Sequence, residues 1–279
     1  MKKGIHRFLM YIVLIIIGFI LIYPLLWMFL SSFKSDNMSI FGTINPIPTS
    51  WTLDGYLLGW NSWGQFDFGH YYVNTFLMVV PTVLFTVVSS TIVGYGFARF
   101  EFPLKKVLFS LMIATLMLPN AVIVIPRYML FNNFGWINSY LPFIVPAAFA
   151  GSAFFIFLMV QFFRGIPREL DESAKMDGCG SLRTFVYILL PLAKPAVVSV
   201  TVLQFIWTWN DFFNSMIFIN SVDKYTLPLA LRLVLDVGSS IAWNQVLAMS
   251  VLSIFPCVIL FFFCQRYFVE GIATTGLKG

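Results

Sequence analysis

Charge is the scarcest property of this sequence. Asp, Glu, Lys and Arg make up 10% of its 279 residues, whereas a soluble domain carries about a quarter. Histidine and cysteine are also rare, with two and three residues. So few cysteines do not make a disulfide framework, and the two histidines, His6 and His70, lie far apart in the chain. The composition therefore excludes an ordinary water-soluble protein and argues against a catalytic or metal site built from clustered ligands.

The sequence is instead rich in long apolar runs. Apolar residues make up 59% of the chain and the mean hydropathy is +0.86. A membrane-spanning helix needs about 20 mostly apolar residues, and the runs show no strand-like alternation, so we expect helices. Six stretches qualify, and they lie at about 8–30, 72–97, 107–125, 143–163, 196–219 and 242–263.

The distribution of Lys and Arg predicts the orientation of these spans. With the N-terminus in the cytoplasm, thirteen of the 17 basic residues fall in inner segments, which is the positive-inside bias. The net charge of +5 is therefore a topology signal, and nothing indicates nucleic acid. Both termini and a charged segment at about 164–191 are predicted to be cytoplasmic. The four outer basic residues are Lys34, Arg127, Lys224 and Arg232.

The 164–191 segment has the pattern of two short helices. Acidic residues follow Pro167, where they favour a helix start, and Gly178 is suited to a helix end. A second amphipathic turn follows and is closed by Pro191. Small residues and acids at such a tip favour docking into a partner's groove. The plainer alternative is a solvated loop lying on the bilayer.

The spacing of this segment resembles a known motif. Glu172, Ser173, Ala174 and Gly178, followed by Ile188, Leu190 and Pro191, resemble the EAA loop of membrane subunits of binding-protein-dependent ABC importers. Ser173 stands where that family usually has Ala. Further resemblances to sugar permeases, and to the smaller maltose-type permease at the end of the chain, occur at 98–103, 125–128, 135–139, 209–212 and 268–279.

The resemblance implies an all-α membrane protein with the type I ABC importer permease fold and six transmembrane helices. It implies one permease domain over 1–279, with a cytoplasmic EAA coupling loop at about 164–191 and a cytoplasmic tail at about 266–279. The chain would be a multi-pass protein of the bacterial cell membrane. The residues implied to dock the ATPase are Glu172, Ser173, Ala174, Asp177 and Gly178.

The resemblance also implies the partners. They are a second permease subunit in a heterodimer, two ATPase subunits, an extracytoplasmic solute-binding protein and a sugar. No phosphate-binding loop of the form Gly-x-x-x-x-Gly-Lys-Ser/Thr occurs in the sequence. We therefore expect no cofactor in this chain and no enzyme activity of its own, with ATP and Mg²⁺ bound by the partner ATPase.

A polar stripe in the fifth apolar stretch is the candidate substrate pathway. Its members recur at intervals of three and four residues, so a helix would carry them on one face, and an ionisable residue within a span is functional or faces a cavity by default. Amides, a carboxylate and an indole suit a sugar, but the same stripe would also suit packing against the partner permease. The residues are Gln204, Trp207, Asn210, Asp211 and Asn214.

Other functions fit the sequence less well. A secondary carrier would show ion-coupling charges or paired interrupted helices, and Asp211 is the one carboxylate placed within a predicted span. The alternative that stays open is an ABC permease for a peptide, a polyamine or phosphate. The sequence does not identify the sugar.

Overall fold

The computed structural model describes residues 2–35, 37–42, 45–61, 63–236 and 241–276. Within these ranges the secondary structure is helical, apart from an isolated bridge between Trp63 and Phe66. The chain divides into two compact units, one formed by Met1–Tyr71 with Ala230–Pro256 and the other by Tyr72–Leu229 with Cys257–Gly279. The prediction of a single permease domain stays a prediction.

The first unit contains α1 (Lys2–Ser31), α2 (Asn37–Phe41), α3 (Asp54–Asn61) and the first half of α15 (Trp243–Gly276). Helix α3 packs closely on α15 because Gly59 leaves room for Met249: a Cβ at Gly59 would lie 3.0 Å from the methyl carbon of that side chain. Trp63 is fully buried in this unit, and its indole Nε1 donates to the carbonyl of Ala230 at 2.7 Å.

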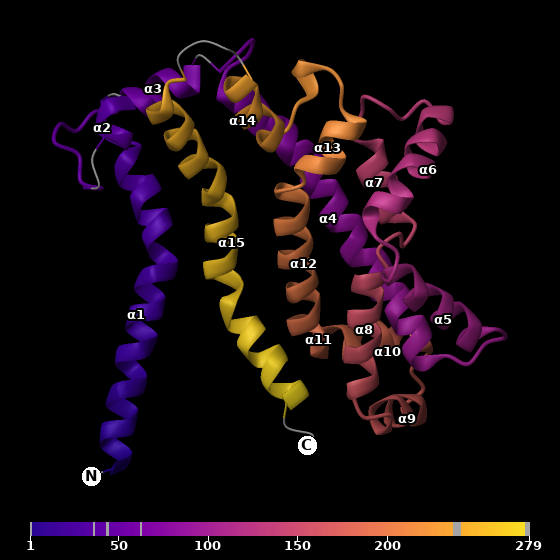
Figure 1. The fold of residues 1–279 in the computed structure, drawn as a ribbon. Coiled ribbons are helices and arrows are strands. Elements are labelled where there is room, and N and C mark those ends of the chain that lie inside the picture. The colour runs from indigo at the N-terminus through magenta and orange to yellow at the C-terminus, as the bar shows by residue number, and fades with distance from the viewer. Residues whose placement is uncertain (1, 36, 43–44, 62, 237–240, 277–279) are drawn as a thin grey trace. The chain divides into compact units, whose positions relative to one another are not determined.

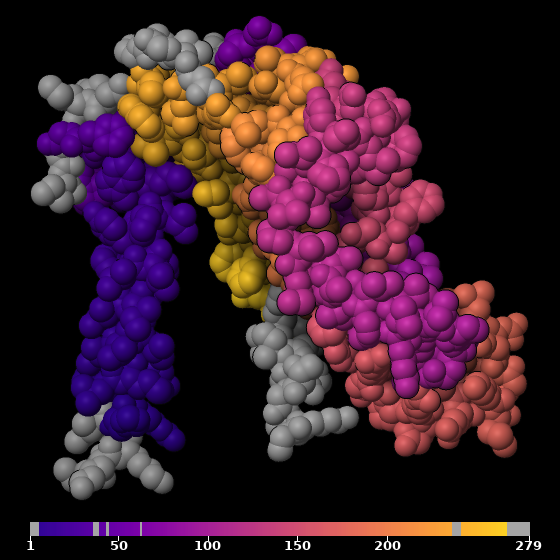
Figure 2. Space-filling view, turned by 45° about the vertical axis from the view of Figure 1, so that its right-hand side comes forward, coloured from indigo at the N-terminus to yellow at the C-terminus, as the bar shows by residue number. Residues whose placement is uncertain are grey.

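Helix α1 is long, apolar and exposed along most of its length. Its most apolar stretch lies within His6–Ser31, and none of that stretch is buried. Figure 2 shows it as an indigo column. Ser31 at its C-terminal end and Ser32 directly after it are buried. Side chains of this kind require lipid or another protein around them.

The second unit holds the main hydrophobic core. It contains α4 (Phe68–Arg99, from Tyr72 on), α5 (Lys105–Leu116), α6 (Asn120–Asn133), α7 (Leu141–Ala148), α8 (Ala153–Gly165) and α12 (Lys194–Trp209) (Figure 1). Helices α4 and α8 approach closely at Gly94, where a Cβ would lie 2.6 Å from the Cβ of Met159. Tyr95, Phe155, Met159, Phe163 and Val200 are among the buried residues of this core.

The described helices support four to six membrane spans. Four helical segments are long and apolar enough alone: His6–Ser31, Phe68–Arg99, Leu141–Gly165 and Trp243–Arg266. Two more pass only as bent pairs, α5 with α6 at 106°, and Ser181–Leu192 with α12 at 72°. The predicted helix at 107–125 is therefore wrong as a continuous element, because α5 ends at Leu116 and α6 begins after Pro119.

Two segments are more helical than the sequence suggested. The connection at 220–241 contains a 3₁₀ turn at Val222–Lys224 and helix α14 (Leu227–Asp236). The predicted tail continues α15 as far as Gly276, while 277–279 lie outside the described residues.

Candidate functional site: the 164–191 segment and a polar pocket

Helix α9 (Glu169–Met176) opens the 164–191 segment. Glu169, Asp171 and Glu172 lie in its first turn, where carboxylates interact favourably with the helix dipole. The helix ends as the sequence predicted: Gly178 has φ +76°, its N–H donates to the carbonyl of Lys175 at 3.0 Å, and the N–H of Cys179 donates to that of Ala174 at 2.8 Å. This pair of bonds is a Schellman motif, which favours glycine at the position with positive φ.

The second half of the segment is anchored in the core of its unit. It consists of α10 (Ser181–Thr184), a π-helical turn at Phe185–Leu189 and α11 (Leu190–Leu192). Phe185 and Leu189 are buried, and the ring of Phe185 stacks on Tyr95 of α4 with centroids 4.6 Å apart. Phe185 and Leu189 belong to the same buried cluster as Tyr95 of α4 and Phe163 of α8, so the turn packs against both helices.

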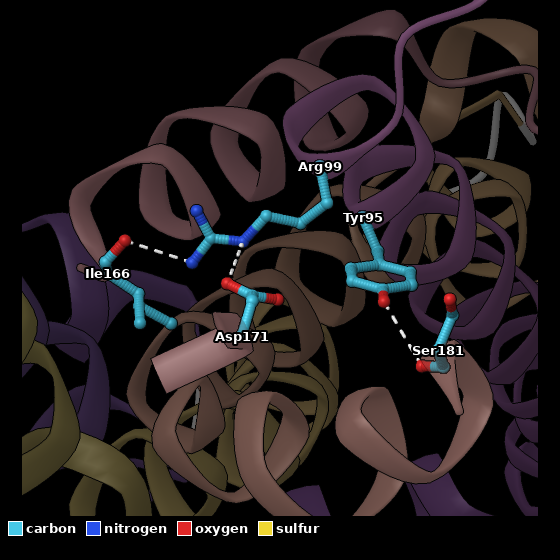
Figure 3. A network of polar contacts seen from close by, with 5 residues as sticks. All are labelled: Tyr95, Arg99, Ile166, Asp171 and Ser181. Atoms are coloured by element: carbon cyan, nitrogen blue, oxygen red, sulfur yellow. Dashed lines mark hydrogen bonds and ion pairs between the residues drawn. The ribbon is translucent and has the colours of Figure 1, made fainter. Parts of the chain in front are cut away.

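A buried ion pair joins α9 to α4 (Figure 3). Arg99, the last residue of α4, places its Nε 3.2 Å from Oδ2 of Asp171, and the two side chains are 6% and 18% exposed. The Nη2 of Arg99 also donates to the carbonyl of Ile166 at 2.9 Å, and the hydroxyl of Tyr95 donates to the carbonyl of Ser181 at 3.1 Å. These contacts hold the start of α9 and the start of α10 against one helix end.

The predicted docking residues divide into two groups. Glu172, Ser173, Asp177 and Gly178 are exposed, whereas Ala174 is 3% exposed and packs inward. Ala174 is therefore unavailable to a partner, and its small size serves packing within the segment. Three apolar side chains of the same segment outside the predicted docking set are also exposed: Met176, Leu182 and Tyr187, at 88%, 75% and 76%.

The predicted polar stripe is interrupted by a helix break. Helix α12 ends at Trp209 and α13 (Phe212–Phe218) begins three residues later, after Asn210 and Asp211, so the prediction of one continuous helix at 196–219 is wrong. Asp211 caps α13, because its Oδ1 accepts from the backbone N–H of Asn214 at 3.0 Å. Asn and Asp favour caps over helix interiors, so the pair Asn210-Asp211 was the signal for this break.

Three members of the stripe still meet in one pocket of about 160 Å³, which we call the Asp211 pocket. Gln204, Asp211 and Asn214 line it, whereas Trp207 and Asn210 do not. Trp207 packs between Phe154 and Phe155 at 5.1 Å from each ring, and the Nδ2 of Asn210 donates to the carbonyl of Ile206. The other lining residues are Thr82, Thr86, Arg127, Pro142, Phe143, Pro146, Ala147, Gly151, Ser152 and Thr208.

An asparagine organises the backbone near this pocket. Asn138 has φ +60°, a conformation that Asn tolerates. Its Oδ1 accepts from the N–H groups of Asn220 and Ser221 at 3.1 and 3.0 Å, and its own N–H donates to the carbonyl of Phe218 at 2.7 Å. The turn at 135–139 is therefore the support for the end of α13.

Comparison with known proteins decides the class. A family model described as "Binding-protein-dependent transport system inner membrane component" matches residues 90–274, a range that includes both the 164–191 segment and the Asp211 pocket residues of α12 and α13. The chain belongs to this family.

Relatives of this permease have related descriptions. It is 35% identical over 257 residues to the probable ABC transporter permease protein YurM of Bacillus subtilis, covering 92% of this chain and 84% of that protein. It is 33% identical over 266 residues to the arabinooligosaccharides transport system permease protein AraQ of Halalkalibacterium halodurans, covering 94% and 93%.

A solved structure shares the fold of this permease. A chain of a bacterial ABC transporter involved in the import of the acidic polysaccharide alginate superposes with a TM-score of 0.82, at 23% identity, over 96% of this chain and 98% of that chain. The permease is accordingly a multi-pass membrane protein with the ABC importer permease fold.

Proposed function

We propose that this permease forms half of the translocation pathway of an ATP-driven, binding-protein-dependent importer for a carbohydrate, of the oligosaccharide class. The match to the family over 90–274 carries the proposal, and the similarity to a permease named for arabinooligosaccharides supports the substrate class. Its partners are a second permease, two ATPase subunits that bind ATP and Mg²⁺, and an extracytoplasmic binding protein. Both termini face the cytoplasm, as the distribution of Lys and Arg indicates.

The exposed part of the 164–191 segment is the docking surface for the ATPase. Glu172, Ser173, Asp177 and Gly178 surround the end of α9, and Met176 projects beside them. Apolar side chains flanked by acids fit a groove with an apolar floor and a basic rim.

The buried part of the same segment transmits the movement. Closure of the ATPase would displace α9, and the Arg99–Asp171 pair would carry that displacement into α4. The stack of Phe185 on Tyr95 provides a second connection to the same helix. Rigid connections of this kind allow a small shift at one end to become a rearrangement of packed helices.

Uptake measurements test the substrate class. In cells that lack this chain, uptake of radiolabelled arabinose, xylose and glucose oligosaccharides should fall for one of these sugars and return when the gene is restored. Parallel assays with labelled peptides, spermidine and phosphate serve as controls. Loss of a non-sugar uptake with every sugar unchanged would assign the permease to another class of solute.

Substitutions at Gly178 test the docking surface. Asn accepts positive φ, so Gly178→Asn should keep the helix end and the ATPase contact. Apart from its two chain neighbours, no described residue has an atom within 4 Å of a Cβ built on Gly178, so there is room for a larger side chain, and the strain that any side chain meets at positive φ is shared by the Asn control. Gly178→Trp should nevertheless abolish co-purification with the ATPase, because the indole would hold the surfaces apart. A complex that survives Gly178→Trp with normal transport would remove Gly178 from the contact.

A further inference from the structure

The Asp211 pocket contains one cation and one anion among its lining residues. Arg127 comes from α6, and Asp211 lies between α12 and α13. From the sequence, Asp211 is a candidate residue of the substrate pathway, whereas Arg127 falls in an outer connection. The fold brings the two residues to one cavity, although they are 84 positions apart.

Each of these charges is held by other groups. The guanidinium of Arg127 lies 5.8 Å from the ring centres of both Phe131 and Phe218, and its Nη1 donates to Oδ1 of Asn120 at 3.4 Å. Asp211 accepts from the backbone N–H and the side-chain amide of Asn214 at 2.8 to 3.0 Å. The two charges attract each other, yet no ion pair within 4 Å joins them. They therefore face the cavity as a separated, balanced pair.

The remaining polar groups of the pocket are uncharged. Thr82, Thr86, Ser152 and Thr208 contribute hydroxyls, and Gln204 and Asn214 contribute amides. The Oδ1 of Asn214 is buried and has no hydrogen-bond partner among the described residues. A buried acceptor of this kind is normally satisfied, and a hydroxyl that enters the pocket would satisfy it.

We propose that the Asp211 pocket is a binding site for a neutral, multiply hydroxylated solute, in which Arg127 is the specificity-determining counter-charge to Asp211. A sugar hydroxyl is both donor and acceptor, so one solute can donate to Asp211 and accept from Arg127. Removal of either charge leaves the other without its counter-charge in a partly buried cavity. The remaining charge would attract ions of opposite sign, and these would compete with a neutral ligand and weaken its binding. The proposal deepens the proposed function and rests on it for the identity of the solute.

Charge-neutralising substitutions test the balance through transport. Asn is also a good helix cap, so Asp211→Asn keeps the acceptor for Asn214. Asp211→Asn and Arg127→Gln should each lower uptake of labelled arabinotriose, or of the sugar found in the uptake panel, about tenfold, which corresponds to one unbalanced charge in a medium of intermediate dielectric. The double variant Arg127→Gln/Asp211→Asn should recover to within about threefold of the wild type. A double variant as impaired as the two losses combined would overturn the proposal.

A chemical probe tests the same balance without transport. Ser152 lines the pocket, so Ser152→Cys in a background with Cys179, Cys257 and Cys264 replaced by serine places one thiol there. We compare its reaction rates with anionic sulfonatoethyl and cationic trimethylammonioethyl methanethiosulfonate, normalised to the neutral hydroxyethyl reagent. Asp211→Asn should raise the anion-to-cation ratio about tenfold and Arg127→Gln should lower it about tenfold. Reaction-rate ratios that do not change in either variant would overturn the charge-balanced site. The proposed function is tested separately, and it would be contradicted only if uptake of every sugar were unchanged in cells that lack this chain.

Discussion

The two ends of the second unit are built in opposite ways. At the 164–191 segment, opposite charges lie 3.2 Å apart and aromatic rings are stacked, so each inward-facing charge lies beside its counter-charge, although the paired atoms, Nε of Arg99 and Oδ2 of Asp171, make no well-formed hydrogen bond. At the Asp211 pocket, a cation and an anion stay apart and a buried amide oxygen has no partner among the described residues. In the proposed function, the first end transmits the movement of the ATPase, and in the further inference the second end binds the solute. Substitutions at the first end should therefore affect stability, and those at the second should affect transport.

Breaking the buried ion pair should have the largest effect. Arg99→Gln or Asp171→Asn leaves one largely buried charge without its partner, for which about 3–5 kcal/mol, the cost at a fully buried pair, is an upper bound. We expect a large fall in the thermal midpoint of the purified permease complex and loss of sugar-stimulated ATP hydrolysis. The double variant Arg99→Met/Asp171→Leu should be more stable than either single variant and still uncoupled. A stable Arg99→Gln protein would show that the first end is not held by this pair.

The approach of α4 to α8 gives the next largest effect. Gly94→Ala forces a Cβ against Met159, and overpacking of this kind costs about 1–3 kcal/mol. Gly96→Ala is the matched control, since no atom within 4 Å meets its Cβ and alanine favours the helix by about 1 kcal/mol. Thermal unfolding should separate the two variants in opposite directions. Equal midpoints would mean that the helices adjust freely at Gly94.

Substitutions in the Asp211 pocket should lower sugar uptake and change thermal stability only slightly. Gln204→Met removes the bond from the amide Nε2 to the hydroxyl of Thr208 at 2.7 Å, for which a cost of about 1 kcal/mol is expected. Its sugar uptake should fall several-fold at unchanged expression. Trp207→Phe is the control, because Trp207 lies outside the pocket. If Trp207→Phe lowered transport more than Gln204→Met does, the result would favour the predicted stripe on one helical face over the Asp211 pocket as the substrate site.

The smallest loss of stability is expected when an exposed ion pair near the 164–191 segment is removed. Lys105 donates to Glu101 at 2.9 Å, and this contact lowers the pKa of the Glu101 carboxyl. A lowered carboxyl pKa contributes stability above the unfolded value and loses it as the pH falls. Lys105→Gln should therefore differ slightly from the wild type at neutral pH and converge with it in acid. Melting curves at several pH values and salt concentrations check this, and a large difference at neutral pH would contradict it.

Local sequence signals predicted the elements that depend on neighbouring residues. Gly178 marked the end of α9 because a positive φ favours glycine, and the long apolar runs marked α1, α4 and α15. The bends escaped prediction because hydropathy averages over them: Pro119 and the pair Asn210-Asp211 lie inside apolar stretches.

The sequence predicted only part of the candidate site, because the positions of some of its residues depend on packing between distant segments. Arg127 joins the Asp211 pocket through the packing of α6 beside α13, and Ala174 turns inward through the packing of α9. Contacts between residues distant in the chain leave no periodic trace in one sequence. The sequence placed Gln204, Asp211 and Asn214 on one helical face, whereas the structure brings them to one pocket across the break between α12 and α13.

The exposure of α1 has a consequence for evolution. A helix whose apolar stretch is not buried is constrained by its hydropathy and length more than by the shape of each side chain. Substitutions among Ile, Leu, Val and Phe there should accumulate freely, while Gly94 and Phe185, each fitted to a neighbouring residue, should resist them. The family model covers residues 90–274, a range that includes Gly94 and Phe185 and leaves α1 outside.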